Sequence, residues 1–262
     1  MPAMGAVVTG GGSGIGRALA RRLAAGGARV VVNDIDAGAA QAVAGEIGGL
    51  AVPADVATRE GVTAVIAAAR AYLGQIDLYC SNAGVVGGGA AGTGGPDGAG
   101  GGEAAWQRAW DVNVMAHVRA AEQLLPAWLA RGEGRLVVTA SAAGLLTMLG
   151  AAPYSVTKHA AVGYAEWLAA TYSHRGLKVH CVCPQGVRTG MLSGSGRAGR
   201  VLLRDSAIEP EAVAEAVWSG MAEGRFLILP HPEVAGYYAA RAGDTGNWLR
   251  GMNRLQQRIE QG

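Results

Sequence analysis

The stretch Ala6-Val7-Val8-Thr9-Gly10-Gly11-Gly12-Ser13-Gly14-Ile15-Gly16 joins an apolar run, a glycine-rich turn and the start of an amphipathic segment. The apolar run predicts a buried strand, and the apolar spacing that follows the turn predicts a helix. Glycines let the backbone approach a phosphate closely, and the free N–H groups at a helix start favour its negative charge. The context of strand, turn and helix argues against a chance match in so glycine-rich a chain. The stretch therefore predicts a site for the pyrophosphate of a dinucleotide, formed by Gly10, Ser13, Gly14, Ile15 and Gly16.

The same alternation of short β-branched runs and alanine-rich helical segments continues along the chain. Strands are expected at residues 6–9, 29–33, 50–53, 78–80, 135–140, 178–183 and 226–229. Helices are expected at residues 15–25, 37–47, 59–72, 104–131, 154–175 and 210–222. This order predicts an α/β fold in one domain over residues 1–262: a Rossmann-type doubly wound parallel sheet of about seven strands, with helices on both faces.

Composition excludes several classes of function. Half of the 262 residues are hydrophobic, and the formal net charge is only +2, with arginines and acidic residues interspersed. The chain can bury a sizeable core and lacks the basic stripe that nucleic acid or an anionic membrane would require. Without a leader segment or a run of about 18 apolar residues, we expect a soluble cytoplasmic protein. Cys80, Cys181 and Cys183 fit reduced, buried thiols, and we expect no metal site.

Polar residues follow the second, third and fourth expected strands. Asp34 comes 18 residues after Gly16, where a carboxylate can accept hydrogen bonds from the adenosine ribose and repel a 2′-phosphate. This placement predicts NAD, rather than NADP, as the cofactor. The alternative for Asp34 is a cap of the helix that begins near Ala37. Further cofactor contacts are expected from Ile35, Asp55, Val56, Asn82, Ala83 and Gly84.

Tyr154 and Lys158 are four residues apart, so they share one face of the helix expected at 154–175. A tyrosine titrates near 10, and a cation held close to it lowers the pKa and makes the phenol a usable acid or base. Of the 22 basic residues only Lys158 and Lys178 are lysines, which suggests that a compact ammonium is required beside Tyr154. The alternative is a chance pair on a surface helix.

Two more polar residues belong with this pair. Ser141 ends the fifth expected strand, thirteen residues before Tyr154, where its hydroxyl can hold a substrate oxygen beside the phenol. Asn113 lies inside the helix expected at 104–131, although asparagine is a poor helix former, which indicates a local polar role. The alternative for Asn113 is an ordinary buried amide.

With the glycine-rich turn, Asn82-Ala83-Gly84, Asn113, Ser141, Tyr154 and Lys158 in this order, the chain resembles the short-chain dehydrogenase/reductase family over roughly residues 4–230. The resemblance is to the shorter, single-domain subgroup. It implies that Tyr154 is the acid or base, Ser141 orients the substrate, and Lys158 binds the nicotinamide ribose and tunes Tyr154. It also implies that Asn113 holds a water that links Lys158 to bulk solvent.

The resemblance extends to the sixth strand and to quaternary structure. The segment 183–189 looks like the family loop that contacts the nicotinamide end of the cofactor, here through Pro184, Val187 and Thr189. Gln185 and Ser81 stand where the family usually has glycine and asparagine. Family members are usually homodimers or homotetramers packed through the long helices, here those expected at 104–131 and 154–175.

Three segments bear on the substrate. The segment 190–205 stands where the family has a flexible lid, and its apolar residues hint at a hydrophobic substrate, with helix packing at an interface as the alternative. The segment 87–102 carries ten glycines and is expected to be a mobile loop beside the site or a tolerated insertion. The tail 230–262 either packs over the pocket or contacts another subunit.

The leading hypothesis is an NAD-dependent oxidoreductase that interconverts a secondary alcohol and a ketone, with Tyr154 moving the proton. Its partner would be a small, hydrophobic molecule. One alternative is an epimerase or dehydratase, which usually carries a larger C-terminal domain than 262 residues allow. Another is an NAD-sensing or scaffold protein without turnover, against which the set Ser141, Tyr154 and Lys158 argues.

Overall fold

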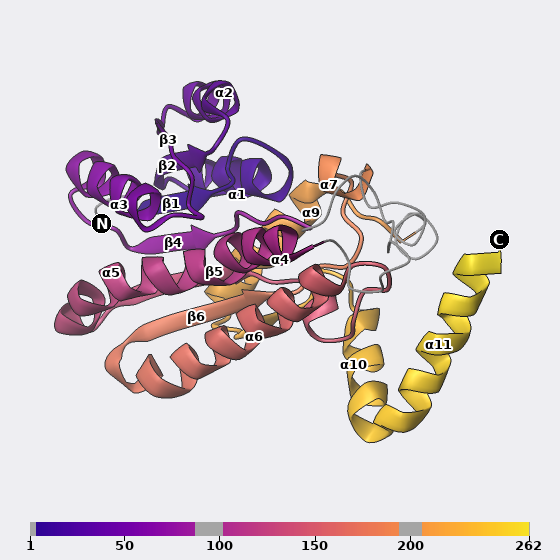
Figure 1. Ribbon diagram of the computed structural model, residues 1–262. Helices are drawn as coiled ribbons and strands as arrows, with labels where there is room; N and C mark the ends of the chain where they lie inside the picture. The colour runs from indigo at the N-terminus through magenta and orange to yellow at the C-terminus, as the bar shows by residue number, and fades with distance from the viewer. Residues whose placement is uncertain (1–3, 87–101, 194–205, 262) are drawn as a thin grey trace.

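A seven-stranded parallel sheet forms the centre of the protein in a computed structural model that describes residues 4–86, 102–193 and 206–261 (Figure 1). The strand order is β3-β2-β1-β4-β5-β6-β7. The strands are β1 (Gly5–Thr9), β2 (Arg29–Asp34), β3 (Leu50–Pro53), β4 (Leu78–Ser81), β5 (Gly134–Thr139), β6 (Leu177–Val182) and β7 (Leu227–Ile228). Continuous apolar strands suit a sheet that is buried on both faces. The prediction of a Rossmann-type doubly wound sheet of about seven strands is confirmed.

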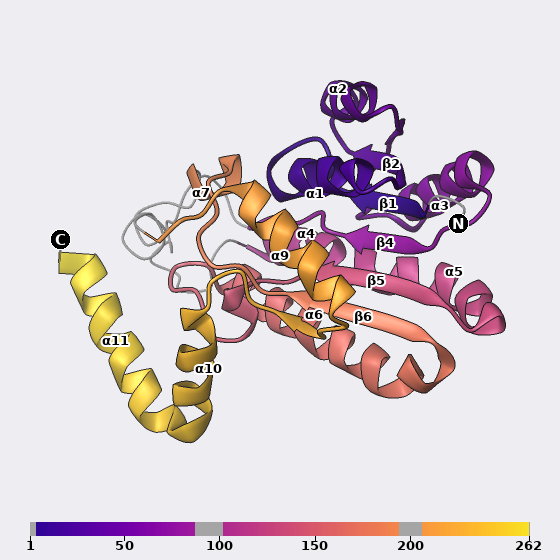
Figure 2. The ribbon, with the colours of Figure 1, turned by 180° about the vertical axis from the view of Figure 1, so that it is seen from behind.

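Helices cover both faces of this sheet (Figures 1 and 2). On one face, α1 (Gly14–Ala25), α2 (Ala37–Ile47) and α9 (Pro210–Ala222) pack on one hydrophobic cluster. On the other, α3 (Arg59–Leu73), α5 (Ala116–Arg131) and α6 (Ala152–Tyr172) pack on a second cluster. Both clusters consist mainly of alanine and valine, whose small volumes let the helices lie close to the sheet.

The chain reverses its direction of winding between β1 and β4, which are neighbours in the sheet although β2 and β3 separate them in sequence. In open α/β sheets, ligands bind outside the carboxyl ends of the strands at such a switch point. The fold therefore places the ends of β1 and β4, and the loops that follow them, beside the expected ligand site.

The prediction of one continuous α-helix at 104–131 is wrong, because a π-helical turn interrupts it. The segment comprises α4 (Glu103–Trp110), a five-residue π-helical turn (Asp111–Met115) and α5. Hydrophobic period alone does not distinguish a single π turn from continuous α-helix, because the apolar face stays nearly in phase. The expected helix at 154–175 begins two residues earlier as α6 and ends in a 3-10 turn at Ser173–Arg175, and the expected strand at 226–229 is only Leu227–Ile228.

Four elements are additional to those that the sequence predicts: a 3-10 turn at Ala142–Gly144, α7 (Gly190–Ser193), α10 (Glu233–Gly243) and α11 (Thr245–Gln261). The last two form a helical hairpin that projects from the sheet domain beside the carboxyl ends of the strands (Figure 1). Most of the glycine-rich segment 87–102 and most of the expected lid at 190–205 lie outside the described residues. Within the described ranges, no helix is both long and apolar enough to cross a membrane.

Candidate active site

A cavity of about 540 Å³ lies outside the carboxyl ends of the strands. The loops after the first six strands, β1 to β6, all line it, and they contribute in turn Gly10, Ile35, Asp55, Asn82, Ser141 and Pro184. Every residue proposed from the sequence for catalysis or cofactor binding lines this cavity, with the exception of Asn113. The structure thus brings together side chains that are up to 179 residues apart in the chain, from Gly10 to Thr189.

The glycine-rich turn needs its glycines for steric reasons. Gly10 and Gly14 adopt φ values of 61° and 49°, a conformation that residues with side chains rarely adopt. A Cβ atom at Gly16 would lie 2.0 Å from the carbonyl oxygen of Gly10, so α1 could not pack this closely on β1 with any larger residue. The Ser13 side chain does not cap α1. The first turn of α1 is therefore suited to an anion at the cavity.

Asp34, at the end of β2, is tied to the glycine-rich turn. Its Oδ2 accepts a hydrogen bond from the amide of Gly12 at 2.9 Å, and its Oδ1 accepts one from the amide of Asp36 at 3.1 Å. The cap of α2 is Asp36, which accepts from the amide of Ala39 at 3.0 Å. The alternative interpretation of Asp34 as the helix cap is therefore wrong.

Asp55, after β3, pairs with a residue that no motif in the sequence singles out. Arg108 of α4 donates to its Oδ2 at 2.9 Å, and both residues line the cavity. Burial alone would raise the pKa of Asp55, but hydrogen bonds from the amide of Ala57 and from Arg108 outweigh burial and lower it. The pair places α4 beside the end of β3, and Val56 lies buried next to it.

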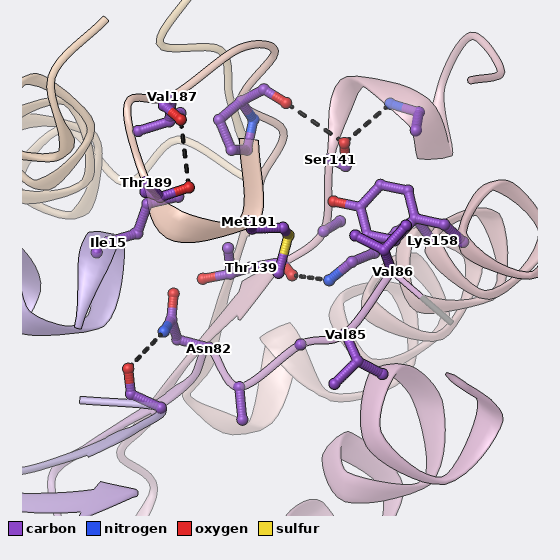
Figure 3. A pocket seen from close by; sticks show the side chains of 18 of the residues that line it. Ile15, Asn82, Val85, Val86, Thr139, Ser141, Lys158, Val187, Thr189 and Met191 are labelled. Carbon is purple, nitrogen blue, oxygen red and sulfur yellow. Dashed lines mark hydrogen bonds between the residues drawn. The ribbon is translucent and has the colours of Figure 1, made fainter. Parts of the chain in front are cut away.

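Asn82 and Ala83 join the ends of β1 and β4. The side chain of Asn82 donates to the carbonyl oxygen of Thr9 at 3.0 Å (Figure 3). The hydroxyl of Thr9 accepts in return from the amides of Asn82 and Ala83, at 3.0 and 3.1 Å. A Cβ atom at Gly10 would lie 2.9 Å from the Cα atom of Ala83. These contacts fix the two loops at the switch point in close contact with each other.

Ser141 and Tyr154 face each other at the other end of the cavity. Ser141 Oγ accepts from the amide of Ala143 at 3.1 Å and donates to the carbonyl oxygen of Pro184 at 3.4 Å (Figure 3). Tyr154 lies in the first turn of α6, half-buried in the cavity wall. Burial raises the pKa of Tyr154, and the hydrogen bond with the Ser141 side chain opposes that rise without cancelling it.

Lys158 lies one turn further along α6 and is only 2% exposed. Its Nζ donates to the carbonyl oxygen of Thr139 at 2.7 Å and lies 5.7 Å from the centre of the Tyr154 ring. Burial lowers the pKa of Lys158 to about 8. In this structure the ammonium bonds to a carbonyl, and burial dominates the titration of Tyr154. The net direction of the Tyr154 pKa shift is therefore upward, and the lowering of the phenol pKa by Lys158 stays a prediction.

Asn113 lies in the π-helical turn and is completely buried, outside the cavity lining. Its Oδ1 accepts from the amide of Val85 at 2.9 Å, and its Nδ2 donates to the carbonyl oxygen of Val85 at 2.8 Å and to Thr157 Oγ1 at 3.0 Å. Each polar atom of its side chain thus has a protein partner. These contacts are also those of an ordinary buried amide, so the functional role of Asn113 and the water that it would hold stay predictions.

The substrate side of the cavity is mostly apolar among the described residues, with Thr147 as a polar exception. The cavity beyond Ser141 and Tyr154 is lined by Val86, Leu146, Met148, Met191 and Leu192. One face of α11 adds Trp248, Met252 and Leu255, which stand at the spacing i, i+4 and i+7. The C-terminal tail thus packs over the pocket. Its amphipathic spacing was the signal in the sequence that identifies this wall.

Known dehydrogenases are similar to this chain over most of its length. The sequence model of the short chain dehydrogenase family matches residues 5–198. This chain belongs to that family. The 1-deoxy-11-beta-hydroxypentalenate dehydrogenase of Streptomyces exfoliatus is 35% identical over 242 residues, which are 87% of this chain and 83% of that protein. Membership identifies the chain as an oxidoreductase of a family that uses nicotinamide cofactors.

Solved structures of short-chain dehydrogenases share the fold over nearly the whole chain. A short-chain dehydrogenase/reductase from Burkholderia phymatum in complex with NAD has a TM-score of 0.83 at 28% identity, covering 93% of this chain and 94% of that one. A singly substituted actinorhodin polyketide ketoreductase with NADPH has a TM-score of 0.76 at 27% identity, covering 90% and 98%. Both nicotinamide cofactors therefore occur on this fold.

Ser81, which stands where the family usually has asparagine, forms a hydrogen bond with a buried histidine. Its hydroxyl lies 2.6 Å from Nδ1 of His117, and both residues are buried beneath the loop after β4. Burial, with a smaller contribution from the nearby Lys158 cation, lowers the pKa of His117 to about 3. His117 is therefore neutral at physiological pH and hydrogen-bonds to Ser81.

Proposed function

We propose that this chain is an NAD-dependent oxidoreductase that interconverts a secondary alcohol and a ketone, with Tyr154 exchanging the proton. The observation that carries the proposal is the meeting of Ser141, Tyr154 and Lys158 at one end of a cavity. The other end of the same cavity holds the glycine-rich turn and Asp34. One cavity thus offers an anion cradle and an acid–base group at opposite ends, as a dinucleotide and its substrate require.

The residues present fit a nicotinamide dinucleotide. Gly10, Gly14 and Gly16 line the cavity in a turn too tightly packed for a Cβ atom, so backbone rather than side chains faces the cavity at the start of α1. Thr139 Oγ1 is buried at the cavity without a partner among the described residues, as expected of a group that bonds to a ligand. When bound, the nicotinamide would accept or supply a hydride. The protein would bind and orient it through Asp34, Lys158, Val187 and Thr189.

The side chains at the reacting end divide the work. Ser141 has a hydroxyl that can turn from the Pro184 carbonyl to the oxygen of the substrate. Tyr154 hydrogen-bonds with Ser141 and would give a proton to that oxygen during reduction or take it during oxidation. Lys158 supplies a buried positive charge near the phenol ring, which would stabilise the phenolate as it forms.

An uncharged, apolar substrate fits this site best. The described residues that line the substrate side carry hydrocarbon, thioether and indole groups, from Leu146 and Met191 to Trp248. Burial of apolar surface against them would supply binding energy, while the hydroxyls of Ser141 and Tyr154 fix the reacting oxygen. The hydroxypentalenate dehydrogenase and the polyketide ketoreductase that resemble this chain bear names of alcohol and ketone chemistry.

The proposal is tested by following NADH formation with NAD and a panel of alicyclic, aryl and aliphatic secondary alcohols at mildly alkaline pH. We expect turnover with apolar alcohols and at least about tenfold lower kcat/KM with carboxylated analogues of similar size, because a buried charge without a partner is costly. Absence of turnover across the panel, despite tight NADH binding, would contradict the proposal and favour the sensing alternative.

Asp34 makes the choice of cofactor testable. In Asp34→Ala we expect the ratio of kcat/KM for NAD to that for NADP to fall roughly 10- to 100-fold. A change of this size corresponds to the loss of about one hydrogen bond to a charged group. Asp36→Ala is the matched control, since Asp36 is a neighbouring carboxylate that caps α2. An unchanged ratio in Asp34→Ala, or an equal change in Asp36→Ala, would show that Asp34 does not select the cofactor.

The organisation into one domain, the cytoplasmic location and the homo-oligomer stay predictions. For the last, α6 offers support, because Val156 and Trp167 of this helix are exposed apolar side chains. Such side chains on one helix favour burial against another subunit.

A further inference from the structure

His231 is a buried histidine outside the cavity lining, in the turn between β7 and α10, and is only 2% exposed. Its Nδ1 accepts a hydrogen bond from the amide of Gln185 at 3.1 Å. Its Nε2 lies 3.0 Å from the carbonyl oxygen of Gly186. Because Nδ1 accepts, the ring proton resides on Nε2 and is donated to Gly186. The imidazole is therefore neutral and held in one tautomer by two adjacent backbone groups.

The amide of Gln185 and the carbonyl of Pro184 belong to the same peptide group. That carbonyl accepts from the amide of Ala142 at 2.8 Å and from Ser141 Oγ at 3.4 Å. One peptide plane is thus held from two sides, by His231 at its N–H and by the Ser141 loop at its oxygen. Hydrogen bonds in such a chain polarise and orient one another.

The residue after this peptide is held as well. The carbonyl oxygen of Gly186 accepts from the amide of Ile208 at 3.1 Å in addition to His231. Val187 and Thr189, which line the cavity, follow directly. Gln185 is outside the set of positive-φ residues, which among described non-glycine residues contains only Thr147. The segment therefore does not need a glycine at position 185, and hydrogen bonds from His231 and from neighbouring backbone groups hold its course.

We propose that His231 is a positioning residue for the reaction. It fixes the Pro184–Gln185 peptide, and through it the resting orientation of Ser141 and the segment that carries Val187 and Thr189. The inference rests on the proposed function, since it assigns His231 a role in aligning groups that act there. His231 itself does not line the cavity, and its hydrogen bonds are to the backbone of Gln185 and Gly186.

Variants at His231 separate this role from simple packing. His231→Phe keeps a ring and removes both hydrogen bonds. We expect it to lower kcat about 10- to 100-fold, the cost of a small misplacement of reacting groups, with the Kd for NADH within about threefold of the wild-type value. His231→Asn retains an acceptor at the position of Nδ1, and its kcat should be at least about fivefold higher than that of His231→Phe.

His180 provides the matched control. It is also buried, at 1% exposure, and its Nδ1 lies 2.6 Å from the carbonyl oxygen of Arg225, but it does not line the cavity. His180→Phe should therefore leave kcat within about twofold of the wild-type value, whatever its effect on stability. If His231→Phe does not fold, His231→Asn and His231→Gln provide the comparison. Asn keeps the Gln185 contact and Gln only the Gly186 contact, so Asn should retain the higher kcat.

A structural measurement gives a result that does not depend on turnover. Hydrogen exchange of the Gln185 amide, followed by NMR, should be slow in the wild-type protein and in His231→Asn, and at least about tenfold faster in His231→Phe. Unchanged exchange in His231→Phe, or a kcat within about twofold of wild type, would overturn the positioning role alone. A wild-type protein without turnover on any alcohol would instead refute the proposed function, and with it the role of His231.

Discussion

Tyr154→Phe is expected to lower kcat/KM for alcohol oxidation by roughly 10²- to 10⁴-fold, the contribution of a positioned acid or base. The substitution removes one oxygen atom and keeps the ring, so the packing of the first turn of α6 is preserved. The Kd for NADH, measured by its fluorescence, should stay within about threefold of the wild-type value. A loss confined to the chemical step is the signature of an interaction made only in the transition state.

The direction of the Tyr154 pKa shift adds a pH dependence to this prediction. Burial raises the pKa of Tyr154, so the phenol is protonated at neutral pH and ready to donate a proton to a ketone. Oxidation needs the phenolate, whose fraction grows as pH rises toward and beyond the usual value near 10. Wild-type oxidation should therefore accelerate with rising pH, and the residual activity of Tyr154→Phe should lack that rise.

Tyr164→Phe is the matched control for Tyr154→Phe. Tyr164 lies on the same helix, is partly buried and stacks on Trp167 with ring centres 6.2 Å apart, but does not line the cavity. We expect its kcat/KM to remain within about twofold of the wild-type value. Retention of more than a tenth of the activity in Tyr154→Phe, or an equal loss in Tyr164→Phe, would show that Tyr154 is not the acid or base.

The fold and most of the cavity lining could be predicted because their determinants are local in sequence. The glycine-rich turn, Asp34, Asn82 and Ser141 each follow a short apolar strand. In a parallel sheet such positions converge on one edge. The order of strands and turns therefore predicts which polar residues meet, without any knowledge of side-chain orientation.

Contacts that depend on orientation were not predictable in the same way. Asp34 and Asp36 both precede α2, and only the structure shows that Asp36 caps the helix. The sequence predicts Asn113 in a regular helix, whereas a π turn directs its amide to the backbone of Val85. The ion pair of Arg108 with Asp55 joins residues that are far apart in the sequence, so no short motif predicts it. Taken singly, each is an ordinary residue of a surface helix or a turn.

Lys158→Arg is expected to lower kcat/KM by roughly 100-fold or more, although it preserves the positive charge. Lys158 is 2% exposed, and its Nζ is 2.7 Å from the carbonyl oxygen of Thr139. A Cβ atom at Gly84 would lie 3.4 Å from that nitrogen. A planar guanidinium is larger than an ammonium and carries five N–H donors. Overpacking and unmet donors would displace it from the position that faces the cavity.

The composition of the chain indicates that lysine, rather than any basic residue, is required at position 158. The chain uses arginine for 20 of its 22 basic residues, and Lys178, the other lysine, is exposed on β6. Lys178→Arg is therefore the matched control and should leave kcat/KM within about twofold of the wild-type value.

Burial lowers the pKa of Lys158 to about 8, so below that pH the folded protein holds a charged group that is more stable in the unfolded chain. The free energy of unfolding should therefore rise between about pH 8 and the usual lysine pKa of 10.4. A buried cation that is retained despite such a cost indicates a functional requirement. If Lys158→Arg keeps more than about a third of kcat/KM, charge alone would suffice there, and the requirement for a compact ammonium would be refuted.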